Sequence, residues 1–335
     1  MAPPKRHSHP GVGIAFILLT AGCFAVSDAT IKFLGATLPV VVLLWARYFF
    51  QTSTMAALQT RRRGWRALLH SGRPGLQFVR AGLLLGNASC SFIGLQYVPL
   101  AEFTALAMLA PMASTLLAWT VLREHVSLAQ WAMVVLGFCG MLVIVRPGVG
   151  ALGWSAAYPL AGALLLAAFQ IVTNRLTLVD GLVTTNLYSG LGALIVLSIA
   201  LAVLPVDLVA TLGQATTEQW LLIVLLGAIA TAGQAFMVLA IRAAPLSTLT
   251  PFAYVQIAFA AAISWLVFRH RPDGVAVVGM VLIALAGAIT VVRGSRQRAA
   301  SGVSIETISG QGLNEPIAPA EDDRSGPQPL AARRP

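Results

Sequence analysis

The segment PLAEFTALAMLAPMASTLLAWTVLR at residues 99–123 decides the fold, because it returns without a gap as PLSTLTPFAYVQIAFAAAISWLVFR at residues 245–269. The residues of the first copy that recur 146 positions later are Pro99, Leu100, Thr104, Ala107, Trp119, Val121 and Arg123. Seven identities in 25 positions exceed what a shared apolar bias produces. The chain therefore contains two versions of one unit.

The composition places this unit in a membrane. The 335 residues are 57% hydrophobic and only 10% charged, with a mean hydropathy of +0.81, whereas a soluble domain carries roughly 25% charged residues. In a soluble protein the net charge of +10 would indicate nucleic-acid binding. Most of the positive charges lie in short segments between apolar runs, where they orient a chain in a bilayer instead. Lipid, and not nucleic acid, is the expected surrounding.

Ten apolar segments have the length of about 20 residues that a spanning helix needs. They cover residues 14–34, 39–58, 75–97, 100–122, 128–145, 157–177, 182–204, 218–241, 246–268 and 274–292. We predict an all-α membrane protein with ten transmembrane helices, built from repeat 1 (13–146) and repeat 2 (147–293). Each repeat holds five helices, and because five is odd, repeat 2 enters the bilayer from the opposite side. Residues 1–12 form a cytoplasmic tail, and residues 294–335 have no apolar run and are expected to be disordered.

The distribution of lysine and arginine predicts which side each loop faces. With the N-terminus in the cytoplasm, thirteen of these residues before the far tail fall in cytoplasmic segments and three, Arg146, Arg269 and Arg271, in outer loops. This asymmetry predicts a multi-pass protein of the inner membrane with both termini in the cytoplasm. Inverted repeats are a recurrent construction of secondary transporters, which bind substrate at mid-depth between the two halves.

Charged residues inside the predicted spans mark a candidate path. The acidic ones are Asp28 and Glu102, and the basic ones are Lys32, Arg47 and Arg80. A charge at the bilayer centre costs about 2.5–3.5 kcal/mol on insertion scales, and such residues usually line a substrate or ion path. Asp28 and Arg47 lie at matching depth, roughly 10 Å from the outer surface at ~1.5 Å per residue. We expect these two side chains to pair.

Structural roles are the alternative for each of these charges. Asp28 and Arg47 could form a static ion pair that fixes the packing of their helices. Lys32 shares a helix face with Asp28; it and Glu102 could complete a substrate-binding network or extend to the outer interface. Arg80 lies near the cytoplasmic end of its helix, and we expect it to extend to that interface.

The second repeat carries neutral polar residues where the first carries charges. Amide and hydroxyl groups in lipid must find partners, so they either join helices or bind a ligand. Pro251 loosens the helix that holds Tyr254 and Gln256, which favours these two as cavity residues, and Tyr254 could stack on an aromatic ring. The neutral candidates for substrate binding are Asn87, Gln170, Asn174, Gln234, Tyr254 and Gln256.

No pattern indicates an enzyme, a cofactor or a metal site. All five histidines fall in predicted loops or termini, and neither an HExxH motif nor a GxSxG motif in its required context is present. Cys23, Cys90 and Cys139 are widely spaced within apolar runs, which argues against a disulfide framework or metal cluster. The lack of a phosphate-binding glycine loop argues against ATP as the direct energy source.

Several segments resemble the drug/metabolite transporter superfamily, and within it the EamA-type family. They include SDATIKFLG (27–35), LWARYFF (44–50) and the region 95–148, in which a charged REHVS loop leads into a glycine-rich helix. Together with FVRAGLLLGNAS (78–89), the first two segments are most similar to the branch that contains bacterial S-adenosylmethionine uptake transporters.

The resemblance implies secondary transport by exchange or ion coupling, through a central cavity lined by both repeats. We therefore expect an alternating-access carrier of a small polar or zwitterionic metabolite, such as S-adenosylmethionine or an amino acid, with a coupling proton or an exchanged metabolite as second ligand. A transporter of riboflavin or a nucleoside-like metabolite, or a drug exporter of the same superfamily, is the alternative. A channel and a membrane-embedded lipid enzyme are rivals from other classes. A homodimer is compatible with the sequence.

Overall fold

A computed structural model describes residues 10–63, 73–123, 126, 128–147, 152–176, 182–204, 206, 208–243 and 246–289. These residues form helices joined by turns, and no strand occurs among them. The tails predicted at 1–12 and 294–335 fall outside the described part, apart from residues 10–12. The predicted fold class, an all-helical membrane protein, is confirmed at this level.

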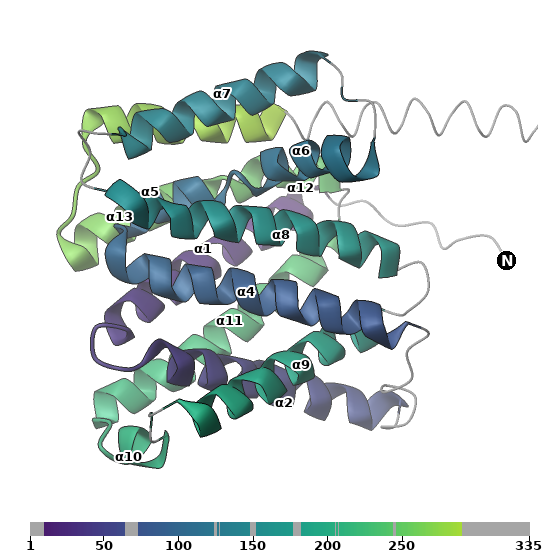
Figure 1. The fold of residues 1–335 in the computed structure, drawn as a ribbon, viewed down its shortest axis with the longest axis vertical. Helices are drawn as coiled ribbons and strands as arrows, with labels where there is room; N and C mark the ends of the chain where they lie inside the picture. The colour runs from purple at the N-terminus through teal and green to yellow at the C-terminus, as the bar shows by residue number, and fades with distance from the viewer. Residues whose placement is uncertain are drawn as a thin grey trace, which may run out of the picture. The chain divides into compact units, whose positions relative to one another are not determined.

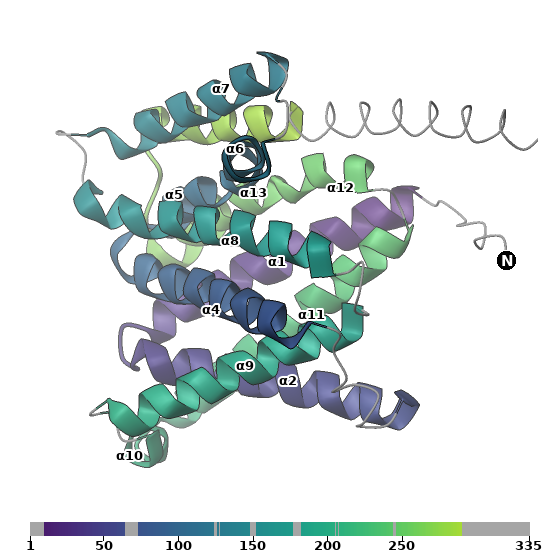
Figure 2. The same ribbon diagram turned by 45° about the vertical axis from the view of Figure 1, so that its right-hand side comes forward.

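Among the described residues, the helices labelled in Figures 1 and 2 number six in the first repeat and six in the second, which also contains a short 3₁₀ helix and one unlabelled last helix. The first six are α1 (Pro10–Leu34), α2 (Val40–Arg63), α4 (Pro74–Tyr97), α5 (Leu100–Ala107), α6 (Ala110–Leu122) and α7 (Leu128–Val145). The others are η1 (Gly153–Ala156), α8 (Ala157–Leu176), α9 (Leu182–Val203), α10 (Leu208–Gly213), α11 (Thr217–Ala243), α12 (Leu246–Ala253) and α13 (Val255–Phe268). An unlabelled last helix covers Gly274–Ile289.

Length and composition identify the helices that can cross a membrane. Among the described residues, six are long and apolar enough, and three shorter apolar helices reach 10 to 17 residues. The six are Gly11–Leu34, Pro74–Tyr97, Leu100–Val121, Gly153–Thr173, Thr217–Met237 and Pro251–Phe268. Helix α2 belongs to neither group, because Arg47, Gln51 and the hydroxyls that follow it interrupt its apolar residues.

Two spans that we predicted as continuous are each broken near the middle. Helix α5 ends at Ala107 and α6 begins at Ala110, while α12 ends at Ala253 and α13 begins at Val255. Proline accounts for the first break, since Pro111 lacks a backbone N–H and its ring clashes with the carbonyl four residues earlier, which is that of Ala107. The second broken helix also carries a proline, inside α12.

The two breaks occupy equivalent positions of the sequence repeat. Met108 and Tyr254 lie in them, 146 residues apart, and the hydroxyl of Tyr254 donates a hydrogen bond to the Met108 carbonyl oxygen at 3.4 Å. The broken helices also end alike, because Arg123 (φ 55°) and Arg269 (φ 56°) both adopt the left-handed conformation that commonly closes a helix. The repeat seen in the sequence therefore recurs in backbone geometry.

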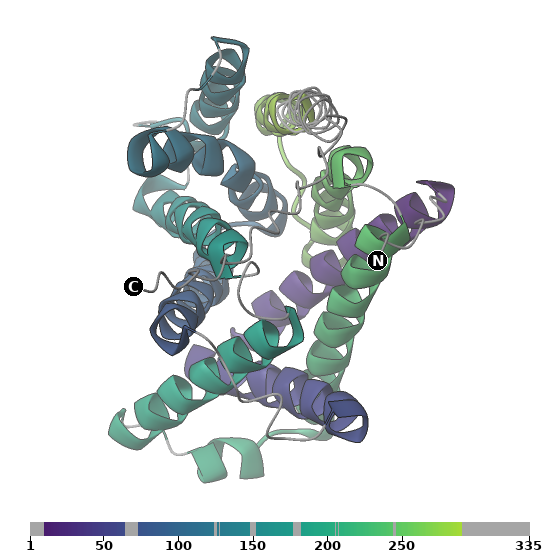
Figure 3. The same cartoon turned by 90° about the vertical axis from the view of Figure 1, so that its right-hand side faces the viewer.

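Helix packing is duplicated in the same way. Helix α1 packs against α11 and α13, and its equivalent α8 packs against α4 and α6. Figure 3 shows α1, in purple, beside α11, in green. Helices α2 and α9 pack against each other. Helix α2 of the first repeat also contacts α11 of the second, and α9 of the second repeat also contacts α4 of the first. The hydrophobic core of the described bundle includes fully buried side chains of α4 and α5, such as Phe92, Leu95, Leu100 and Leu106.

Helix α7 and the last helix cross at a pair of glycines. A Cβ atom added to Gly140 would lie 2.8 Å from the backbone oxygen of Gly279, and one added to Gly279 would lie 2.7 Å from that of Gly140. Small residues allow membrane helices to approach backbone to backbone. These two positions therefore exclude any side chain as long as the crossing is maintained.

Candidate functional site

Asp28, Arg47 and Gln256 form a polar group inside the helical bundle, which we call the core cluster. They come from α1, α2 and α13, so three helices contribute one group each. Asp28 interacts electrostatically with Arg47 and through its side chain with the Gln256 amide. Gln256 is only 8% exposed. The cluster thus combines an anion, a cation and an amide.

Arg47 is held in an unusual environment for a cation. Its guanidinium carbon lies 5.7 Å from the centroid of the Phe92 ring, within the range of a cation–π contact. Its Nε atom is buried and has no hydrogen-bond partner among the described residues. A buried donor without a partner costs about 1–3 kcal/mol.

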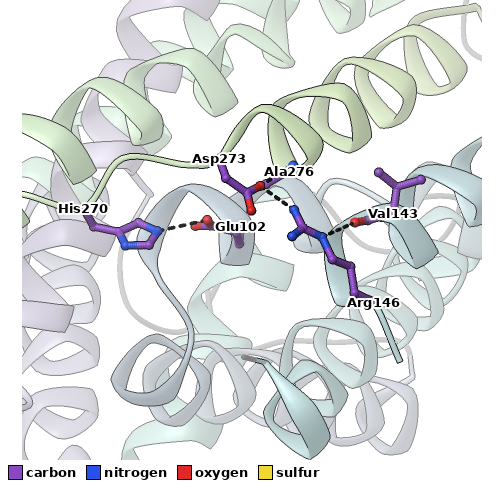
Figure 4. A network of polar contacts seen from close by, with 6 residues as sticks. All are labelled: Glu102, Val143, Arg146, His270, Asp273 and Ala276. Atoms are coloured by element: carbon purple, nitrogen blue, oxygen red, sulfur yellow. Dashed lines mark hydrogen bonds and ion pairs between the residues drawn. The ribbon is translucent and has the colours of Figure 1, made fainter. Parts of the chain in front are cut away.

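Lys32, Glu102 and His270 form a second group, the end cluster, where α1 ends, α5 begins and the loop after α13 passes. A carboxylate oxygen of Glu102 lies 3.0 Å from Nε2 of His270, as Figure 4 shows. The other oxygen is buried without a hydrogen-bond partner among the described residues. Lys32 interacts electrostatically with Glu102.

The ammonium group of Lys32 also closes the end of a neighbouring helix. It donates hydrogen bonds to the carbonyl oxygens of Leu95 and Val98, the latter at 2.9 Å, and lies 6.0 Å from the centroid of the Phe268 ring. Carbonyls in the last turn of a helix lack intrahelical partners, and a lysine can satisfy them. Lys32 therefore ties α1 to the C-terminus of α4.

An ion pair between Arg146 and Asp273 joins the end of α7 to the start of the last helix (Figure 4). Asp273 also accepts a hydrogen bond of 2.7 Å from the backbone N–H of Ala276, as a helix N-cap does. The hydrogen bond from Arg146, followed by that from Ala276, lowers the pKa of Asp273 below its ordinary value. This pair therefore stabilises the fold above the ordinary pKa of aspartate, near 4, and loses that effect in more acidic solution.

The predicted charge network is thus divided in two. Asp28 and Arg47 interact electrostatically, but within the described part of the chain they do not form the direct ion pair that we expected. Lys32 donates hydrogen bonds to the carbonyls at the end of α4 and interacts electrostatically with Glu102. Glu102 is buried against His270 and does not extend to an interface.

The expectation that Arg80 extends to the interface is wrong. The residue is 3% exposed, its Nε donates to the hydroxyl of Thr173 at 2.8 Å, and its guanidinium also donates to Ser189. The guanidinium carbon lies 4.4 Å from the centroid of the Phe169 ring. Arg80 therefore binds α4 to both α8 and α9.

We expect Arg80→Met to lower the melting temperature of detergent-purified protein by several degrees. The change removes two hydrogen bonds from a charged group, which is a loss of roughly 1–3 kcal/mol. Ser189→Ala and its combination with Arg80→Met complete a double-mutant cycle. Additive melting shifts in that cycle would contradict the proposed bond.

The neutral candidates are dispersed. The side-chain amide oxygen of Gln170 accepts a hydrogen bond from the Ser114 hydroxyl at 3.1 Å and so joins α8 to α6, while Asn87 packs on Gly162 where α4 meets α8. Tyr254 is buried at the helix break against Gly287.

The remaining neutral candidates differ in how they are placed. Gln234 lies half-buried on α11, and the side chain of Asn174 is outside the described part. Among the neutral candidates, Gln256 is the residue that meets Asp28.

Sequence reasoning missed His270 and Phe92. His270 follows a span directly, and we assigned it to a loop without a role. Phe92 carries no signal that separates it from other apolar residues of α4. Both roles depend on contacts with residues at least 45 positions away in the chain, such as Arg47 and Glu102.

A groove of about 600 Å³ lies elsewhere, on one face of α1, α11 and α13. It is lined by α1 residues between Ala15 and Val26 together with Ile229 and Phe259. This lining is apolar and suits an acyl chain better than a charged metabolite. Among the described residues, no group of three or more histidine, cysteine or acidic side chains could hold a metal ion.

The chain matches one protein family and is similar to several bacterial proteins named as transporters. The EamA-like transporter family matches residues 11–146 and again residues 153–292. An S-adenosylmethionine uptake transporter of Rickettsia prowazekii is 24% identical over 271 residues, covering 81% of this chain and 89% of that protein. A riboflavin transporter of Rhizobium johnstonii is 26% identical over 291 residues, covering 86% and 93%. The pseudopaline exporter CntI of Pseudomonas aeruginosa is 26% identical over 275 residues, covering 82% and 94%.

Proposed function

Because the chain belongs to the EamA-like transporter family, we propose that it is a secondary active transporter that carries a small polar or zwitterionic metabolite by alternating access. The observation that carries this proposal is the core cluster, which holds an anion, a cation and an amide inside a membrane bundle. Buried ionisable groups at such a position usually mark a substrate or ion path.

The proposed architecture has ten spans in two inverted five-helix repeats. The equivalent helix breaks at Met108 and Tyr254 support it, as does the duplicated packing of α1 on α11 and of α8 on α4. The two repeats exchange conformations, and each exchange opens the site to the other side of the membrane. The arginine distribution supports an inner-membrane location with both termini in the cytoplasm.

The chemistry of the core cluster favours a zwitterion. Asp28 would bind the ammonium or another cationic group, and Arg47 would bind a carboxylate through its unpaired Nε. Gln256 would orient the ligand and hold Asp28. S-adenosylmethionine and amino acids carry both charged groups, and relatives named for S-adenosylmethionine uptake are similar over most of this chain.

A neutral heterocyclic substrate such as riboflavin or a nucleoside is the second candidate. The second repeat supplies amides, and relatives named as riboflavin transporters are equally similar. A coupling proton on Asp28, or an exchanged metabolite, is the proposed driving ligand for either class. Because one similar protein is named as an exporter, import and export are both compatible with this proposal.

Ligand-induced stabilisation followed by counterflow tests the proposal. We expect S-adenosylmethionine or an amino acid to raise the melting temperature of purified protein, since a ligand at 100 times its Kd stabilises by about 2.7 kcal/mol. Proteoliposomes loaded with the unlabelled compound should then take up the labelled compound from outside faster than empty proteoliposomes do. Flux without this acceleration would indicate a channel, and stabilisation by riboflavin alone would favour the second candidate.

A further inference from the structure

The two side-chain contacts of Figure 4, one between Glu102 and His270 and one between Arg146 and Asp273, both connect the repeats at one end of the molecule. Glu102 belongs to repeat 1 and His270 to the loop after α13 in repeat 2. Arg146 and Asp273 are divided between the repeats in the same way. The segment between α13 and the last helix is therefore fastened to repeat 1 twice.

This end lies directly above the core cluster. Lys32 is four residues beyond Asp28 on α1, which is about 6 Å at ~1.5 Å per residue, and it interacts with Glu102. The contact between Glu102 and His270 therefore lies near the end of α1 that is about one helical turn beyond Asp28. In the proposed orientation, this is the outer end.

The pair is built from one accessible and one inaccessible partner. The side chain of His270 is 41% exposed, whereas that of Glu102 is 8% exposed. A proton from the outer solution can therefore reach the imidazole. Protonation of the imidazole turns a hydrogen bond between a neutral ring and the Glu102 carboxylate into a contact between opposite charges, which strengthens it; histidine is the side chain most often used as a proton sensor near neutral pH.

The other charged groups near His270 are accounted for. Lys32, on α1, faces Glu102. Asp273, in the same segment, interacts electrostatically with His270, but Arg146 from α7 forms an ion pair with it. Arg271 lies over the Trp265 ring, 4.7 Å from its centroid. Glu102 is thus the one carboxylate that contacts the imidazole among the described residues.

The sequence repeat supplies no equivalent pair at the opposite end. The offset of 146 residues places Thr248, a neutral residue, at the position equivalent to Glu102. The pair therefore occurs at one end of the bundle and not at the repeat-related end. A contact at one end can stabilise one of the two access conformations over the other.

We propose that Glu102 and His270 form an outer latch that holds the outward path closed, and that protonation of His270 tightens it. The latch rests on the proposed alternating access. It is tighter when the imidazole carries a proton and releases more readily when the imidazole is neutral. Transport that begins from the outside is then slower in acid.

Accessibility of the core cluster from outside tests the latch without any substrate. The reporter is Gln256→Cys in a background in which Cys23, Cys90 and Cys139 are replaced by alanine. A membrane-impermeant thiol reagent is applied to intact cells at pH 6 and at pH 8. Because thiol reactivity itself rises with pH, the measured quantity is the labelling rate of a variant divided by that of the parent at the same pH.

We expect His270→Gln to label at least about fivefold faster than the parent at pH 6 and at nearly the same rate at pH 8. Glu102→Gln provides a second variant, with the same expected ratio at pH 6. Arg271→Gln is the matched control, because it removes a cation from the same segment without touching Glu102, and its ratio should stay near one.

Equal labelling of His270→Gln and the parent at pH 6, or a ratio that does not change with pH, would overturn the latch. Labelling does not depend on substrate, so the outcome is independent of the transport assay. Loss of counterflow for every tested compound, with the pH-dependent ratio intact, would refute the proposed substrate class and support the latch.

Discussion

Asp28→Asn is expected to reduce counterflow by at least about 100-fold, which corresponds to roughly 2.7 kcal/mol, while the protein still folds and reaches the membrane. Asparagine keeps the volume and can still meet the Gln256 amide, but it removes the negative charge. Neither a cationic group of a substrate nor a coupling proton would then have its partner. Initial rates in proteoliposomes with equal protein content measure this loss.

A control on the same helix separates charge from packing. Thr30→Val is nearly isosteric, and the hydroxyl it removes bonds to the Val26 carbonyl of its own helix at 2.8 Å. We expect counterflow within about twofold of the parent for this variant. Wild-type transport by Asp28→Asn would refute the assignment of Asp28 to the binding site.

Neutralising both charges distinguishes substrate binding from a static ion pair. If Asp28 and Arg47 only balance each other, Asp28→Asn combined with Arg47→Gln should recover stability and transport, because breaking a buried pair is costlier than removing it. We expect the double variant to recover stability but to remain inactive. The geometry favours this outcome, since the two residues interact without a direct ion pair and the Nε of Arg47 is left unpaired.

The second large effect is expected for Gly279→Leu, which should lower the melting temperature by 10 °C or so or prevent recovery of folded protein. A Cβ atom at this position would lie 2.6 Å from the Cγ1 atom of Ile144 and 2.7 Å from the Gly140 oxygen. The second contact is with backbone and cannot be relieved by a rotamer change. Overpacking of this kind costs about 1–3 kcal/mol or more.

Gly82→Leu is the matched control for this effect. Gly82 is exposed on α4, and a Cβ atom there would have no neighbour within 4 Å. We expect an unchanged or slightly raised melting temperature, because leucine has the better helix propensity. A large loss for Gly82→Leu together with none for Gly279→Leu would show that the α7 crossing is misplaced. Fluorescence-detected size exclusion after heating is sufficient to rank the variants.

These glycines illustrate how far sequence reasoning reached. Gly82 and Gly86 are four residues apart, which is the small-residue spacing of a helix-packing motif, yet a Cβ atom at Gly82 would have open space and one at Gly86 would meet only Leu165. A spacing motif tells which residues share a face of one helix. It does not tell which face turns toward a neighbour, since that depends on how the whole bundle packs.

The sequence by itself determined the membrane location, the positions of most helices and the duplication of one unit. Apolar length, proline positions and the 146-residue offset are local or self-repeating features, and each helix satisfies its own backbone hydrogen bonds in lipid. The family was suggested by the resemblance of segments such as SDATIKFLG (27–35) and LWARYFF (44–50), and the match to the EamA-like family confirms it. Asp28, Arg47 and Gln256 could be selected because polar residues are expensive in a bilayer.

Only the tertiary structure decided which of these groups meet. The pairing of Glu102 with His270 joins residues 168 positions apart, Lys32 binds carbonyls 63 and 66 positions away, and Arg80 is buried against Ser189. The physical reason is that the rotation of each helix about its axis is fixed by side chains packed against several others at once. The local sequence around a charged residue therefore does not indicate which residue on another helix will contact it.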